Sequence, residues 1–184
     1  MNSIELMIYE HTHILRMLAV VRKASDQVLK GAAINYEDFD KMIDFIQNYA
    51  DGHHHGKEEK FLFQAMVDQL GKMGSNLISH GMLVEHDWGR LFIAELKDAL
   101  NRVKAGDEES RLDVIANAVG YANHLKRHIT KEDQVVYPFG EKQLPPEILA
   151  HIHAQTEAFE AEASQQGIQR YYIDLLEELE KKYL

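Results

Sequence analysis

Residues 54–63, HHGKEEKFLF, and residues 128–137, HITKEDQVVY, share one pattern. Each stretch has a His, two residues, Lys, Glu and a second acid, and then apolar and aromatic side chains. A second repeated pair, Glu10-His11 and Glu85-His86, precedes them. The first pattern recurs after 74 residues and the second after 75. The chain is therefore predicted to contain two helical hairpins of one design, each with a Glu-His and a His-x-x-x-Glu.

Apolar residues recur at spacings of three and four, which is the periodicity of helices and not of strands. No Pro precedes Pro138, so long helices meet no interruption before it. The predicted helices span residues 2–30, 36–70, 76–104, 109–137, 146–163 and 168–183, with breaks at Gly- or Pro-containing stretches. Because short turns join the long helices, we predict an all-α, up-down-up-down four-helix bundle over residues 1–140. Residues 141–184 are predicted to form a helical C-terminal extension.

The composition limits the class of protein. The chain has 184 residues, no Cys and a formal net charge of −10. The lack of Cys excludes disulfides, thiolate metal sites and iron–sulfur clusters. The acidic balance argues against nucleic acid and anionic membrane surfaces as partners. The N-terminus has no signal-peptide pattern and no apolar run is long enough to span a bilayer, so we expect a cytoplasmic protein.

The repeated His and Glu residues are predicted to share one layer of the bundle. In an antiparallel hairpin, residues equidistant from the turn lie side by side. Residues 11 and 54 are equidistant from a point between residues 32 and 33, in the first predicted turn. Residues 58 and 86 centre on residue 72, and residues 86 and 128 centre on residue 107, in the next two turns. The residues placed in the layer are His11, His54, Glu58, His86, His128 and Glu132.

Apolar residues at helical spacing from each of these side chains turn them toward the core. Buried imidazoles and carboxylates without partners are costly. Divalent cations remove this cost, because neutral His and ionised Glu are good ligands. We therefore predict a two-metal site, and the alternative is a buried His–Glu hydrogen-bond network without metal. His13 is expected to be exposed, His53 to be solvated, and His151 and His153 to be structural or on the surface.

Four motifs together resemble the hemerythrin-like (HHE) cation-binding family. They are EHTHILR at 10–16, HHGKEEKFLF at 54–63, MLVEHDWGR at 82–90 and HITKEDQVVYP at 128–138. The resemblance covers about residues 4–140 and implies a non-heme di-iron centre with the six residues above as ligands and Glu58 and Glu132 as bridges. Gln64 departs from the family pattern, in which Pro is frequent. Met82 stands where the oxygen carrier has a further His, which argues against reversible oxygen carriage.

The missing nitrogen ligand has three candidates in this sequence. His55 is favoured, because the position after the second-helix His looks like a ligand in related iron sensors and the apolar Leu62 and Met66 follow it on the helix. His124 is the close rival on the His128 face, and His80 is a distant third. A solvent ligand is the remaining alternative.

Function is predicted in two classes. A binding protein would sense, store or scavenge iron, dioxygen or nitric oxide, with a stress-response role. An enzyme or repair factor would consume peroxide or nitric oxide, or donate iron to damaged iron centres. We favour the binding protein, and a scaffold with a structural metal is a third option. Two irons are the expected cofactors, with zinc or manganese as alternatives. We expect the extension to pack on the bundle or form a homodimer contact, without a role in metal binding.

Overall fold

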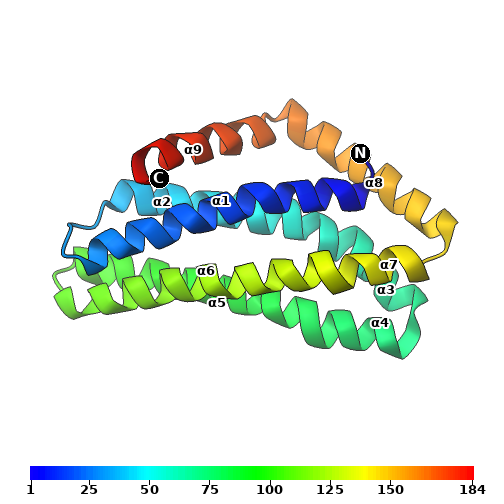
Figure 1. Ribbon diagram of the computed structural model, residues 1–184, viewed down its shortest axis with the longest axis horizontal. Helices are drawn as coiled ribbons and strands as arrows, with labels where there is room; N and C mark the ends of the chain where they lie inside the picture. The colour runs from blue at the N-terminus through cyan, green and yellow to red at the C-terminus, as the bar shows by residue number, and fades with distance from the viewer.

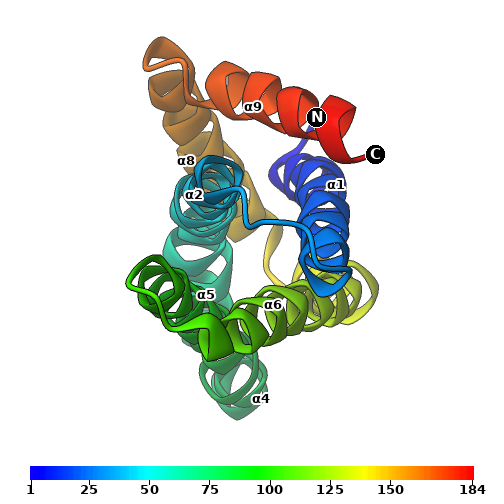
Figure 2. The same ribbon diagram turned by 90° about the vertical axis from the view of Figure 1, so that its left-hand side faces the viewer.

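The computed structural model describes residues 1–184 as an elongated bundle of helices without strands (Figure 1). The first long helix is α1 (Ser3–Leu29). The second runs through α2 (Tyr36–Phe45), η1 (Ile46–His55), η2 (Glu58–Phe63) and α3 (Gln64–Gln69). The third comprises α4 (Gly71–Leu77), η3 (Ile78–Met82) and α5 (Leu83–Lys104). The fourth comprises η4 (Glu108–Ser110), α6 (Arg111–Lys131), η5 (Glu132–Val136) and α7 (Tyr137–Gln143). Figure 2 shows α1, α2, α5 and α6 arranged around one axis.

The helix ends follow from local chemistry. Asn2 and Glu5 form a capping box at the start of α1, in which each side chain pairs with the other residue's backbone N–H at 2.9 Å. Gly31 (φ 94°) and Gly106 (φ 100°) turn the chain after α1 and α5, a backbone conformation that strongly favours Gly. The all-α bundle prediction is confirmed. Two predicted boundaries are wrong, because the third helix begins at Gly71 instead of 76 and the fourth continues past Pro138 to Gln143.

Three of the four long helices contain π-helical turns. These are η1, η2, η3 and η5, and Pro138 lies in the first turn after η5. A π turn has more residues than an α turn and is frequent at functional sites. Because it reduces the angular step between neighbouring side chains, His53, His54 and His55 can all be buried at the end of η1. Simple α-helical periodicity does not predict this.

The apolar core is divided into two clusters. The larger includes Ile14, Phe39, Leu100 and Val114, and the smaller includes Met7, Phe63 and Tyr137. A layer of buried polar side chains lies between these clusters along α1, with His11 and His13 between Met7 and Ile14. The site therefore sits inside the bundle, walled on both sides by apolar packing.

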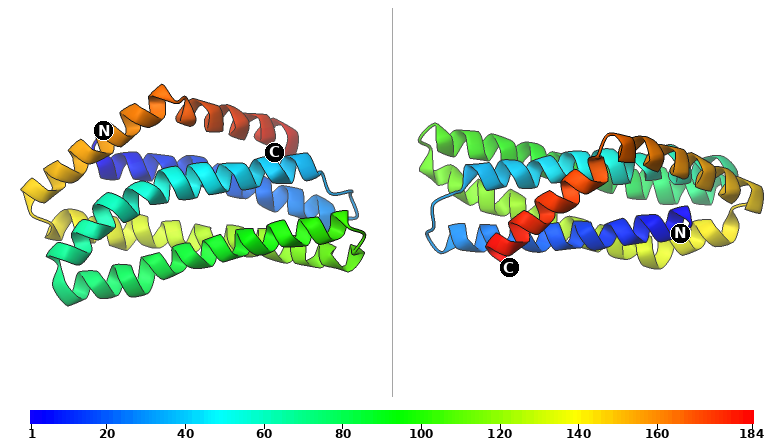
Figure 3. Two further views of the ribbon diagram at one scale, coloured as in Figure 1. Left: turned by 180° about the vertical axis from the view of Figure 1, so that it is seen from behind. Right: turned by 90° about the horizontal axis from the view of Figure 1, so that it is seen from above.

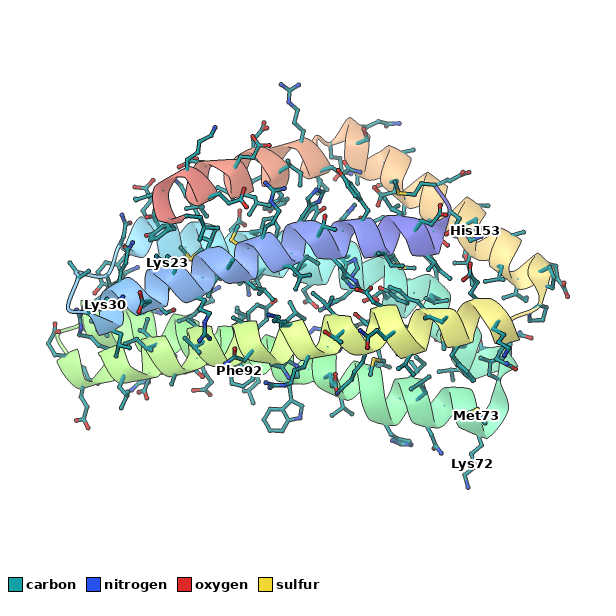
Figure 4. The ribbon with its side chains drawn as sticks, viewed as in Figure 1. Lys23, Lys30, Lys72, Met73, Phe92 and His153 are labelled. Carbon is teal, nitrogen blue, oxygen red and sulfur yellow. The ribbon has the colours of Figure 1, made fainter.

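The C-terminal extension consists of α8 (Pro146–Gln165) and α9 (Ile168–Tyr183) and packs on the bundle. Figure 3 shows the two helices crossing the face formed by α1 and α2. Leu176 and Leu179 of α9 are fully buried in the larger cluster. His153 of α8 contacts the start of α1 through Ser3, whose backbone nitrogen lies 3.3 Å from the ring Nδ1 (Figure 4). No helix combines the length and apolar character needed to cross a membrane.

Candidate metal centre

Seven buried side chains from four helices meet in the polar layer. They form two neighbouring groups, His11, His54, Glu58 and Glu132 in the first and His55, His86 and His128 in the second. Within each group the nearest ligand-type atoms lie within 4.8 Å of one another. The groups adjoin, because His128 Nε2 lies 2.9 Å from Glu132 Oε1. The structure thus brings together the six residues that the repeat placed in one layer, and His55 with them.

Each of the five imidazoles in these two groups is held by a carboxylate through Nδ1. The pairs are His11 with Asp133 (2.7 Å), His54 with Glu10 (2.8 Å), His55 with Asp51 (3.2 Å), His86 with Glu59 (2.6 Å) and His128 with Glu85 (3.0 Å). A carboxylate on one ring nitrogen fixes the ring and leaves the other nitrogen free to coordinate a cation. The Nε2 atoms of His11 and His54 face each other at 2.9 Å, and those of His86 and His128 at 3.0 Å.

Glu58 and Glu132 are fully buried in the middle of the layer. Glu58 Oε2 and both carboxylate oxygens of Glu132 have no hydrogen-bond partner other than the imidazoles of the layer. Of these imidazoles, His128 Nε2 lies 2.9 Å from Glu132 Oε1 and His11 Nε2 lies 3.3 Å from Glu132 Oε2. Glu58 Oε1 accepts a hydrogen bond from the Tyr137 hydroxyl. Buried carboxylate oxygens without donors are rare unless a cation binds them. This donor set of inward-facing nitrogens and unpartnered oxygens fits two metal ions.

The electrostatics of the layer follow from crowding buried charges. Burial and the neighbouring Glu132 raise the pKa of Glu58 to about 8. Burial alone would lower the pKa of His11 and His128, but the adjacent carboxylates raise it to about 9 and about 10. Burial and the nearby His11 lower the pKa of His54 to about 4. In the metal-free protein, protonated His11 and His128 balance the charge of the buried carboxylates, whereas His54 is neutral.

The two halves of the layer are related by the sequence repeat, with two differences. Glu10 corresponds to Glu85, and Lys57 corresponds to Lys131. The first difference is that Tyr137 of the fourth helix stands where the second helix has Phe63. Ile129 stands in the fourth helix where His55 stands in the second. The second group therefore has a third imidazole, and its His55 ring stacks on the His86 ring with 3.8 Å between the ring centroids. The first group instead has the Tyr137 ring stacked on His11 at 5.6 Å.

The other His predictions have mixed outcomes. His124 Nε2 lies 2.7 Å from the backbone carbonyl oxygen of Glu85, outside the layer. His80 is exposed on η3. The expectation that His13 is exposed is wrong, because its Nδ1 meets the Tyr49 hydroxyl at 2.9 Å in a buried contact.

The expectation that His53 is solvated is also wrong. His53 is buried, and its Nε2 lies 3.1 Å from Glu10 Oε1 and 3.0 Å from Glu160 Oε1. The ammonium group of Lys57 contacts all three of these residues. Glu10, His53 and Glu160 resemble a metal-binding group in their composition, but the lysine supplies the positive charge between them.

A small pocket of about 190 Å³ lies beside the second group. His55 and His86 line its inner side, and Asp51, Arg90 and Tyr121 are among its other walls. The guanidinium group of Arg90 bridges Asp51 and Glu59, the carboxylates that hold His55 and His86. The sequence pattern alone does not predict this role of Arg90.

A helical bundle with a buried layer of imidazoles and carboxylates defines a cation-binding helical protein. Residues 2–139 match the model of the hemerythrin HHE cation binding domain family. The chain belongs to this family, and the predicted resemblance is confirmed. No curated protein and no solved structure matches the chain.

Proposed function

We propose that the chain holds two metal ions in this layer, iron where iron is available, and uses them to bind a small ligand. His11, His54, Glu58 and Glu132 would hold one ion, and His55, His86 and His128 would hold the other together with the same two carboxylates. The observation that supports this most strongly is the buried pair Glu58 and Glu132, three of whose four carboxylate oxygens have no hydrogen-bond partner while the imidazole Nε2 atoms face inward. Bound iron would supply redox chemistry and open coordination positions for a diatomic ligand.

The protein's own residues prepare the site for this role. The five carboxylates on the imidazole Nδ1 atoms fix the rings before a cation arrives. The apolar clusters on both sides exclude bulk water from the layer. We propose that the protein senses, stores or scavenges iron, dioxygen or nitric oxide in the cytoplasm, as part of a stress response. A homodimer stays an alternative for its assembly.

A second candidate function, consumption of peroxide or nitric oxide, has support from Tyr137. Its hydroxyl group donates to Glu58 and lies 3.5 Å from His11 Nε2, so a hydrogen-bond donor faces the layer. Burial and Glu58 raise the pKa of Tyr137 well above its usual value, so the hydroxyl would orient a ligand for turnover through a hydrogen bond and would not give up its proton.

The test is an optical titration of the iron-loaded, reduced protein with dioxygen, nitric oxide and peroxide in turn. Binding without turnover supports sensing or scavenging, and catalytic loss of peroxide or nitric oxide supports the enzyme. If none of the three alters the spectrum of the iron-loaded protein, binding and consumption of these small ligands both fail, and only storage or sensing of iron or a structural metal is left.

A further inference from the structure

The two halves of the layer share a motif outside the candidate ligands. In the first half, the Glu10 carboxylate accepts from His54 Nδ1 and contacts the Lys57 ammonium group. In the second half, the Glu85 carboxylate accepts from His128 Nδ1 and contacts Lys131. Each motif therefore joins a lysine, a carboxylate and one candidate metal-binding imidazole.

The two copies differ in what covers them. The Lys57 side chain is fully buried at 0%, whereas that of Lys131 is 51% exposed. Helix α8 packs against α1 (Figure 1), and its Glu160 contacts Lys57 of the first copy and His53. In the structure nothing corresponding to Glu160 contacts Lys131, whose ion pair is with Glu85 alone. The C-terminal extension therefore makes two otherwise similar halves unequal.

Glu160 balances the charge of this buried cluster. Lys57 lies between Glu10 and Glu160, so two carboxylates share one buried ammonium group. Glu160 is fixed in turn by Gln169 of α9, whose Nε2 donates to Glu160 Oε2 at 2.9 Å. Without Glu160, the Glu10 carboxylate would be the one acidic partner of both Lys57 and His53. The same carboxylate also holds His54. Removing one partner of a buried ionic group disturbs the groups that remain.

We propose that Glu160 is a positioning residue for the metal centre, acting through Lys57 and Glu10 on the His54 ring. The position at His11 and His54 then depends on the C-terminal extension, and the position at His86 and His128 does not. This inference rests on the proposed two-metal function. It replaces the expectation that the extension takes no part in metal binding.

The experiment titrates the metal-free full-length chain with zinc, which is diamagnetic, and follows His54 and His128 separately by NMR of ¹⁵N-histidine at fixed pH. For Glu160→Gln, the His54 transition should move to about tenfold higher free zinc, the lower range for losing a carboxylate that supports a ligand. The His128 transition should not move. Glu85→Gln should do the reverse. Glu157→Gln, an exposed site on the same helix with the same change of charge, should leave both transitions in place.

Equal shifts at His54 and His128, or no shift at either, would overturn the proposal. If Glu160→Gln unfolds, as shown by loss of the helical circular dichroism signal, the experiment uses Gln169→Ala in its place. That substitution removes the hydrogen bond that fixes Glu160 and leaves the charge of Glu160 unchanged. A shift confined to His54 is expected there too, and its absence refutes the coupling. If the wild-type chain takes up no metal, the two-metal function fails. The ¹⁵N-histidine NMR spectrum of the metal-free protein then tests the coupling between Glu160 and His54. Glu160→Gln should lower the population of the His54 tautomer that carries its proton on Nδ1, and an unchanged spectrum contradicts the proposal.

Discussion

Replacing Glu58 with glutamine separates the charge of this buried side chain from its shape. The amide retains an oxygen that can accept from the Tyr137 hydroxyl, as Glu58 does. It cannot carry the negative charge that a bridging carboxylate brings to a metal ion. We therefore expect the substitution to stabilise the metal-free protein and to weaken metal binding, so that one change has opposite effects on the two states.

The magnitude follows from proton linkage. Burial and Glu132 raise the pKa of Glu58 from 4.5 to about 8. A group with a raised folded-state pKa contributes stability below its unfolded pKa and loses it as the pH rises through the folded value. At about pH 7 folding must add a proton to Glu58, at a cost of roughly 3 kcal/mol, whereas at about pH 5 the cost is below about 1 kcal/mol. Glutamine carries no such cost.

Urea unfolding of the metal-free proteins measures this difference. Glu58→Gln should be more stable than wild type by about 2 kcal/mol at neutral pH, and the gain should shrink below about 1 kcal/mol near pH 5. With metal added, the order should reverse, because only wild type gains the full binding energy. Glu157→Gln is the control for loss of one exposed acidic group. A metal-free Glu58→Gln protein that is less stable than wild type at both pH values would refute the reasoning.

Three further predictions concern proton release, Tyr137 and the extension. Metal binding should release protons, since His11 and His128 have raised pKa values of about 9 and about 10, so metal affinity should fall as the pH falls. Calorimetry in buffers of different ionisation enthalpy checks this, and buffer-independent heats would contradict it. Tyr137→Phe should keep both metals but lower the unfolding free energy by about 1–3 kcal/mol, because Glu58 loses a buried hydrogen bond; metal analysis and urea unfolding decide. Leu176→Ala should lower stability by about 2–5 kcal/mol with unchanged metal stoichiometry in the folded protein, since Leu176 is fully buried in the larger cluster.

Periodicity predicted the helices because it depends on short-range spacing, and the internal repeat together with the turn positions predicted the layer. The antiparallel arrangement brought residues far apart in sequence to one height, and the structure brings together those that the turns predicted, such as His11 with His54. The boundary at Pro138 was misplaced, because Pro often ends a helix but lies here in the first turn after a π segment.

The surroundings of the layer were harder to predict from sequence. His53 was expected to be solvated, and Lys57 and Lys60 follow it along the same helix. The structure shows Lys57 buried with it, and the partner that makes this tolerable, Glu160, lies 103 residues further along the chain. Such a pairing depends on how α8 crosses the bundle. His55 lies at the end of the π-helical segment η1 and is buried in the layer. The α-helical spacing of the sequence does not indicate such a segment.

Metal content is the measurement that tests the two-metal centre most directly. The wild-type chain is produced with iron, purified without air and analysed for metal per polypeptide, beside Glu132→Ala. Two ions per wild-type chain and a sharp loss in the variant are expected, because Glu132 lies within reach of imidazoles from both groups, 3.3 Å from His11 and 2.9 Å from His128. Less than about one ion per wild-type chain, or equal content in the two proteins, would contradict the account.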